Sequence, residues 1–175
     1  MTDEILLIFA ETIAHLISAR ARLKGHASRS YDELISLAIR KVDEVAPLNV
    51  SKAAAERARE LRLAKDLRQY CWFCQTQKRG MKDPDREIFH WEHYTTVDEM
   101  AREIYSLGES PAPPDIAVVL RRAKIVWILK SENAKLSGAG AGSRRADPQQ
   151  AYADAGITLG HEWTECTRVP CEWHG

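Results

Sequence analysis

The stretch FHWEHYTTVDEM, residues 89–100, contains the side chains best suited to acid–base chemistry. It carries His90, Glu92 and His93 within four positions. A histidine can take up or release a proton near neutral pH, and a neighbouring carboxylate can orient it or bind a metal ion. We expect a strand that ends near His93. In such a strand His90 and Glu92 point to one face and His93 points to the other.

The four cysteines of the chain form two close pairs. Cys71 and Cys74 have the two-residue gap that lets both thiolates reach one zinc ion, and Cys166 and Cys171 lie near the C-terminus. Two such pairs separated by a long insert are typical of a structural zinc site. In a reducing cytosol, paired cysteines bind metal more often than they form disulfides. We therefore expect one structural Zn²⁺ held by all four cysteines.

Other interpretations of the cysteines stay open. His161 or His174 could replace one of the thiolates as a zinc ligand. The Cys-x-x-Cys stretch could instead be a redox pair, although a thioredoxin-like motif follows a strand and precedes a helix. It could also supply two buried apolar side chains beside Trp72 and Phe73.

The order of Cys-x-x-Cys, hairpin, acidic–His pair, helix and second Cys pair resembles the HNH endonucleases of the zinc-stabilised, ββα-metal type. The resemblance covers about residues 71–107. It implies that His93 is the general base and that Glu92 occupies the acidic position. It also implies a divalent ion, Mg²⁺ or another, that neutralises charge on a phosphodiester. The expected activity is metal-dependent cleavage of DNA or RNA in a mobile-element or defence system.

The chain departs from the HNH pattern after His93. The family has a hydrophobic–Pro turn there, whereas this chain has YTTV, residues 94–97. The family's later Asn follows soon after the His, whereas the candidate in this chain, Asn133, lies far downstream. These departures keep two alternatives open. One is a non-catalytic, zinc-stabilised module that binds protein or nucleic acid. The other is a metal-free ribonuclease toxin.

Several basic residues could hold a phosphate in either type of nuclease. Lys130 follows a predicted buried strand, where sites often form in sheet proteins, and Arg144 and Arg145 follow a glycine-rich loop. Lys78 and Arg79 lie in the predicted hairpin turn. The chain as a whole has 25 basic and 25 acidic residues and a formal net charge of zero. Nucleic-acid binding would therefore use a local patch, since nucleic-acid-binding domains are usually basic overall.

Helical patterns dominate the first third of the chain. Apolar spacing and capping residues predict three helices there, at about residues 2–25, 30–47 and 51–70. Ser30 and Glu33 have the spacing of a capping box, and Ser51 can cap the third helix. Further along, patterns predict a hairpin over 71–91, helices at 96–107, 114–123 and 147–157, and a central strand over 124–130. Thr96 and Glu99 form a second predicted capping box. The fold class is therefore α+β and mainly helical. We expect an N-terminal helical bundle or arm, 1–70, and a zinc-stapled β-hairpin/helix domain, 71–175, with a flexible loop at about 137–147.

The first helix also bears on where the protein works. Asp3 and Glu4 stand where a secretory signal would carry positive charge, and Glu11 interrupts the apolar run. We therefore expect a cytoplasmic protein with no membrane partner. A protein partner could bind through the N-terminal helices.

Overall fold

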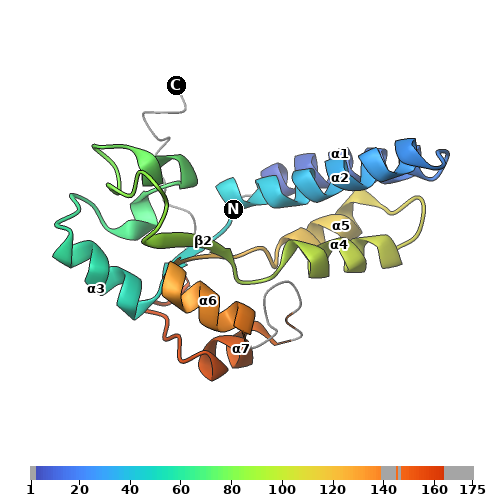
Figure 1. The fold of residues 1–175 in the computed structure, drawn as a ribbon. Helices are drawn as coiled ribbons and strands as arrows, with labels where there is room; N and C mark the ends of the chain where they lie inside the picture. Colours follow the sequence, from blue (N-terminus) through green and yellow to red (C-terminus); the bar gives the residue numbers. More distant parts are fainter. Residues whose placement is uncertain (1–2, 139–144, 146, 164–175) are drawn as a thin grey trace. The chain divides into compact units, whose positions relative to one another are not determined.

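The structure is a computed structural model that describes residues 3–138, 145 and 147–163 (Figure 1). The chain divides into two compact units that interleave in sequence. The helical unit comprises residues 1–46 and 95–123, and the sheet unit comprises residues 47–94 and 124–175. The predicted α+β, mainly helical class is confirmed.

The helical unit contains four helices in two layers, α1 and α2 in one and α4 and α5 in the other (Figure 1). α1 packs against α2 and α5, and α4 packs against the same two helices. Isoleucines contribute much of the fully buried core, including Ile13, Ile35, Ile104 and Ile116. The bounds of the elements are α1 Asp3–Arg20, α2 His26–Lys41, η1 (a 3₁₀ helix) Val42–Glu44, α4 Val97–Ser106 and α5 Pro113–Leu120.

The sheet unit is built on a mixed three-stranded sheet in the order β1-β3-β2. β3 pairs in parallel with β1 and antiparallel with β2, so the strand predicted to be central is central. The strands are β1 Leu48–Val50, β2 Phe89–His93 and β3 Ile125–Leu129. The helices that the structure describes in this unit are α3 Lys52–Glu60, α6 Lys130–Gly138 and α7 Pro148–Asp154, with 3₁₀ helices η2 Leu67–Gln69 and η3 Trp72–Thr76.

The two faces of this sheet pack differently. On one face, Val126 and Ile128 of β3 pack with Leu136 of α6 and Tyr152 of α7, and Figure 1 shows both helices on the same side of the sheet. The other face carries an aromatic cluster, in which Trp127 contacts Phe89 and Trp91 edge-on. Both faces are therefore covered, which explains why β3 is apolar along its whole length.

Two predicted helix caps are confirmed, and one is wrong. Thr96 and Glu99 form a full capping box at α4, and Ser51 accepts a hydrogen bond from the Ala54 N–H at α3. The box predicted at Ser30 does not form, because α2 begins four residues earlier. Gly25, with φ of 62°, is its N-cap residue. The Ser30 hydroxyl instead donates to the carbonyl oxygen of His26, one turn back.

The predicted hairpin over residues 71–91 is wrong. The segment instead forms η3 and a compact loop, and β2 finds its partner in β3 far along the chain. A Cβ on Gly80 would lie 2.1 Å from the carbonyl oxygen of Cys74, so the loop closes on itself where only glycine fits. The buried Asp83 carboxylate accepts N–H groups from Ile88 and Phe89, which fixes the start of β2.

The division into units also differs from the predicted split at residue 70. The missed element is β1: three buried residues before the Ser51 cap that pair with β3. This pairing places residues 47–70 in the sheet unit with β3. The predicted third helix also stops at Glu60 instead of continuing to about residue 70.

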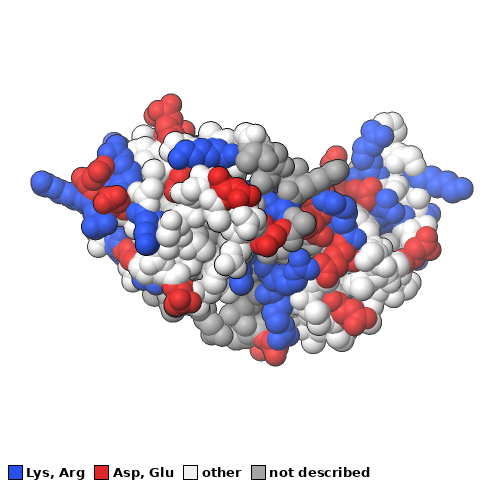
Figure 2. Space-filling view, turned by 90° about the horizontal axis from the view of Figure 1, so that it is seen from below, with Lys and Arg blue, Asp and Glu red and all other residues white. Residues whose placement is uncertain are grey.

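The described surface carries charges of both signs. Figure 2 shows basic and acidic side chains interspersed over the face that it draws, as the neutral composition predicts. Among the described helices, none is both long enough and apolar enough to cross a membrane.

Candidate active site

β2 brings His90 and Glu92 to one face of the sheet, as the alternation of a strand predicts. His90 pairs with Ile128 of β3, and Glu92 pairs with Val126. Both partners belong to the apolar cluster under α6 and α7. A charged side chain at position 92 is therefore set against a hydrophobic core and needs polar partners to be stable there.

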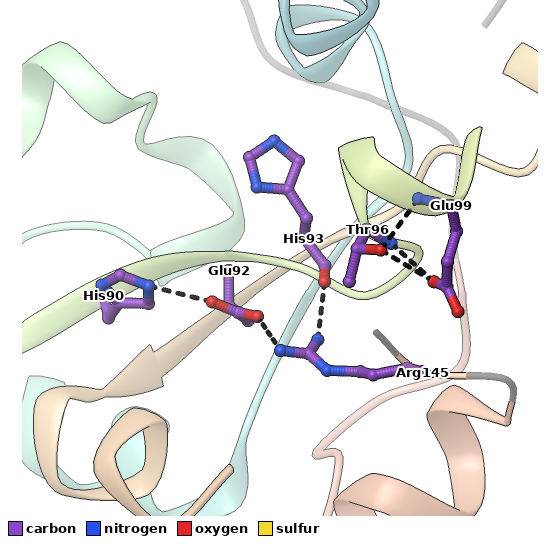
Figure 3. A network of polar contacts seen from close by, with 6 residues as sticks. All are labelled: His90, Glu92, His93, Thr96, Glu99 and Arg145. Carbon is purple, nitrogen blue, oxygen red and sulfur yellow. Dashed lines mark hydrogen bonds and ion pairs between the residues drawn. The ribbon is translucent and has the colours of Figure 1, made fainter. Parts of the chain in front are cut away.

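Glu92 finds those partners on both sides. Its Oε2 atom lies 2.9 Å from Nε2 of His90, and its Oε1 atom accepts a hydrogen bond from Arg145. The Arg145 guanidinium also donates to the carbonyl oxygen of His93, at 2.8 Å. Figure 3 shows His90 and Arg145 at the two ends of the Glu92 carboxylate. The cluster His90–Glu92–Arg145 is referred to below as the Glu92 network.

The Glu92 network keeps its carboxylate charged. Burial opposes ionisation, but the hydrogen bond with His90 and the positive charge of Arg145 outweigh it, so the pKa of Glu92 lies below its ordinary value. An ionised carboxylate can only accept hydrogen bonds. His90 therefore carries its proton on Nε2 when the ring is neutral, and the lone pair is on Nδ1. The His90 side chain is 25% exposed, so this ring can meet a solute.

Tyr152 of α7 closes the network on the side of the core. The Arg145 guanidinium lies 5.7 Å from the centre of its ring. Its hydroxyl is buried and has no hydrogen-bond partner among the described residues. Burial, and then the charge of Glu92, raise the pKa of Tyr152 well above its ordinary value, so this phenol stays protonated. Tyr152 thus adds to the low-dielectric surroundings of Glu92, in which charges interact more strongly than in water.

His93 lies apart from this network. Its ring points away from the Glu92 carboxylate (Figure 3), as expected for adjacent residues of one strand. The backbone carbonyl of His93, not its ring, takes part in the network through Arg145. In the structure, the carboxylate of Glu92 contacts the ring of His90. The resemblance to HNH endonucleases instead pairs Glu92 with His93.

The other predicted site residues lie in different places. Lys130 is exposed at the start of α6, and its N–H donates to the carbonyl oxygen of Ile88, two residues before His90. Asn133 is half-buried on α6, and no described contact joins it to the Glu92 network. Arg145 is fully buried and bound to Glu92, so its guanidinium is not placed at the surface for a substrate. Arg144 lies outside the described residues.

The Cys71–Cys74 loop brings its two sulfur atoms to 3.3 Å. Cys74 is buried and Cys71 is half-buried. Two thiolates on one zinc ion lie about 3.8 Å apart, given the usual Zn–S bond length and tetrahedral geometry. The pair therefore fits half of a zinc site. The predicted partners Cys166 and Cys171, and His174, lie outside the described residues. Within the described part of the chain, no group of three or more metal-binding side chains occurs.

The carboxylate of Glu92 does not fit the divalent ion that the HNH resemblance implies beside it. One oxygen is bound to the His90 ring and the other to the Arg145 guanidinium. A cation at either oxygen would have to displace one of these partners and would face the positive charge of Arg145. The Glu92 carboxylate therefore acts through its two protein partners, His90 and Arg145.

Sequence reasoning missed the residue that builds the loop before β2. The Asp83 carboxylate accepts the side-chain N–H of Gln75 at 2.8 Å as well as N–H groups at residues 87–89. Asp83 thus fastens the cysteine loop to the strand that carries His90. Its signal was the Asp-Pro dipeptide at 83–84, since an Asp before Pro favours a turn held by the Asp side chain. Lys78 and Arg79 are exposed in this loop.

The chain was compared with family models, with curated proteins and with solved structures, and none of the three comparisons found a match.

Proposed function

We propose that the chain is a nuclease that cleaves phosphodiester bonds, with His90 and Glu92 as its acid–base dyad. The observation that carries the proposal is the His90–Glu92 contact of 2.9 Å, made to a carboxylate that Arg145 holds ionised. A histidine oriented by a fixed carboxylate is suited to general-base catalysis. The proposed substrate class, a nucleic acid, is the one expected from the sequence. The proposed general base is His90 and not His93.

The form of nuclease that this geometry supports best acts on RNA without a metal ion. RNA carries its own nucleophile, the 2′-hydroxyl, next to the scissile phosphate. Nδ1 of His90 would take the 2′-OH proton, and the 2′ oxygen would attack phosphorus to form a cyclic phosphate. The bond from phosphorus to the 5′ oxygen would break, and that oxygen would take a proton from water. The exposed ammonium of Lys130 would neutralise charge that develops on the phosphate.

The test is cleavage of a labelled single-stranded RNA by the full chain in buffer without Mg²⁺ and without a chelator, so that any structural zinc stays bound. General acid–base catalysis contributes about 10²–10⁴-fold to a rate, so His90→Gln should lose at least about 100-fold. Glu92→Gln should also lose rate, because an amide does not enforce the tautomer with its lone pair on Nδ1. His15→Gln, an exposed histidine on α1, is the matched control and should keep full activity. Equal cleavage by wild type and His90→Gln would contradict the role of His90 as the base.

Further arms separate this proposal from the HNH form. Cleavage of DNA or RNA that requires Mg²⁺ and is lost in His93→Gln, but not in His90→Gln, would overturn the dyad and support the HNH form. If no nucleic acid is cleaved, with or without Mg²⁺, the nuclease proposal is wrong and the non-catalytic binding module is the remaining alternative.

We also propose that Cys71 and Cys74 supply half of a structural zinc site, completed from the C-terminal segment. The close approach of the two sulfur atoms supports this proposal. Metal analysis of the purified chain should find about one zinc ion per chain, lost in Cys71→Ser and in Cys166→Ser. A zinc-free chain that unfolds at the same temperature with and without added zinc would contradict it.

A further inference from the structure

A hollow of the sheet unit lies beside β1. It is a cleft of about 700 Å³ between α3, the loop that follows α3, and the segment around Gly160. This volume falls in the range of about 300–1,000 Å³ that is typical of small-molecule sites. Since β3 separates β1 from β2 in the sheet, this α3 cleft is distinct from the site of the Glu92 network.

The walls of the α3 cleft are fixed by backbone hydrogen bonds. The segment after α7 returns along β1 and α3: the N–H of Gly160 donates to Val50 at 2.7 Å, and the N–H of Lys52 donates to Thr158 at 2.8 Å. The side-chain amide of Asn49 holds the next turn by donating to the carbonyl oxygen of His161 at 2.8 Å. These bonds make the cleft part of the fold rather than a gap between loose loops.

The floor of the cleft is apolar and made of small side chains. Ala55 and Ala58 of α3 line it, together with Leu63 and Leu67. Alanines on a helix let a ligand approach the backbone closely, and the two leucines add apolar surface. The floor therefore suits the hydrophobic body of a small molecule.

The rim of the cleft carries an excess of positive charge. Lys52 and Lys65 are exposed there, and neither ammonium group forms an ion pair with a described residue. The nearby Asp66 carboxylate is already paired with Arg68, at 3.0 Å. His161 and an Arg59–Glu56 pair at 4.0 Å complete the charged rim. Lys52 and Lys65 can therefore bind a ligand with their ammonium groups, and their positive charge attracts an anion.

Two N–H groups at the N-terminus of α3 already have partners. The N–H of Lys52 is bound to the carbonyl oxygen of Thr158, and the N–H of Ala54 is bound to the hydroxyl of Ser51. Recognition of the negative charge falls to the side chains of Lys52 and Lys65. Flexible ammonium groups at the rim can donate hydrogen bonds to a phosphate or a carboxylate.

We propose that the α3 cleft binds a small amphipathic anion: an apolar body on the alanine floor, with one phosphate or carboxylate between Lys52 and Lys65. Two sources share this chemistry, a nucleoside monophosphate and a medium-chain acyl acid. The proposal does not depend on the proposed nuclease activity.

The test is NMR titration of the full chain with adenosine 5′-monophosphate and, separately, with decanoate. At least one probe should bind saturably and shift the amides of Ala55 and Ala58, and the probe that binds identifies the source. Uncharged adenosine or decanol, and inorganic phosphate alone, should bind about tenfold more weakly or worse, since each lacks half of the recognised chemistry.

Variants locate the binding. The double substitution Lys52→Gln/Lys65→Gln should weaken binding by about tenfold or more, and Ala55→Leu should weaken it by filling the floor. Lys135→Gln, an exposed lysine on α6, is the matched control and should bind normally. His90→Gln should also bind normally, which separates this proposal from the nuclease. Either the absence of saturable binding of both probes at millimolar concentration, or binding that the double substitution leaves unchanged, would overturn the proposal.

Discussion

Each unit of the molecule contains a carboxylate bound to an arginine, and the two clusters differ in their burial. In the helical unit, Asp32 binds Arg20 and accepts a hydrogen bond from the hydroxyl of Tyr105 at 2.8 Å. The side chains of Arg20 and Asp32 are each 38% exposed. In the sheet unit, the side chains of Arg145 and Glu92 are 0% and 9% exposed.

The contrast shows what burial adds to the same chemistry. The hydrogen bond from Arg20 is the main cause that lowers the pKa of Asp32. Both side chains of this pair are also partly exposed to solvent. At Glu92 desolvation is the largest single influence and acts against the charge, so the pKa falls only because His90 and Arg145 together exceed it. A buried carboxylate whose charge depends on two partners occurs both at functional sites and in structural ion pairs.

The largest predicted effect comes from breaking the buried pair. Arg145→Met leaves the Glu92 carboxylate buried with half of its partners, and such changes cost about 3–5 kcal/mol of the free energy of unfolding. Urea unfolding of the full chain at neutral pH measures this cost. The double variant Glu92→Met/Arg145→Met is the control: it removes both charges and should recover most of the loss. A single variant as stable as wild type would show that the pair does not form.

A much smaller effect is expected at the half-buried Arg20–Asp32 pair. Arg20→Met should change the free energy of unfolding by about 0–1 kcal/mol, because water still reaches both side chains and weakens their coupling. The same urea experiment measures it. A loss as large as that of Arg145→Met would remove the distinction between the two clusters.

The smallest predicted effect is in the acid dependence of stability. The pKa values of Asp32 and Glu92 are both lowered by folding, so each carboxylate stabilises the protein above the pKa of the unfolded chain. That contribution is lost as the pH falls through the folded pKa. Glu92→Gln and Asp32→Asn should each flatten the decline in unfolding free energy below about pH 5. A decline as steep as that of wild type in both variants would contradict the two pKa directions.

Local signals in the sequence were enough to predict much of this fold. The capping box at Thr96 and the apolar run of β3 each act within a few residues, and the structure confirms both. The alternation of a strand also predicted that His90 and Glu92 share a face. These features depend on backbone geometry that neighbouring residues set by themselves.

The rest of the fold and site depends on contacts between distant residues. β1 has three residues and forms a strand because β3 pairs with it. An alternating apolar pattern cannot be recognised in so short a segment. Arg145 reaches Glu92 from 53 positions away in sequence, so its partner could not be predicted from spacing. The hairpin prediction failed for the same reason: the true partner of β2 follows it by about thirty residues, beyond two helices.

A ¹³C NMR titration of the Glu92 carboxyl group, assigned by comparison with Glu92→Gln, measures whether His90 and Arg145 hold this buried carboxylate ionised and thereby fix the His90 tautomer. If they do, the pKa of Glu92 lies below about 4.3, the ordinary value for a glutamate. A pKa above that value would mean that burial prevails over both partners, and the proposed His90–Glu92 dyad would lose its basis.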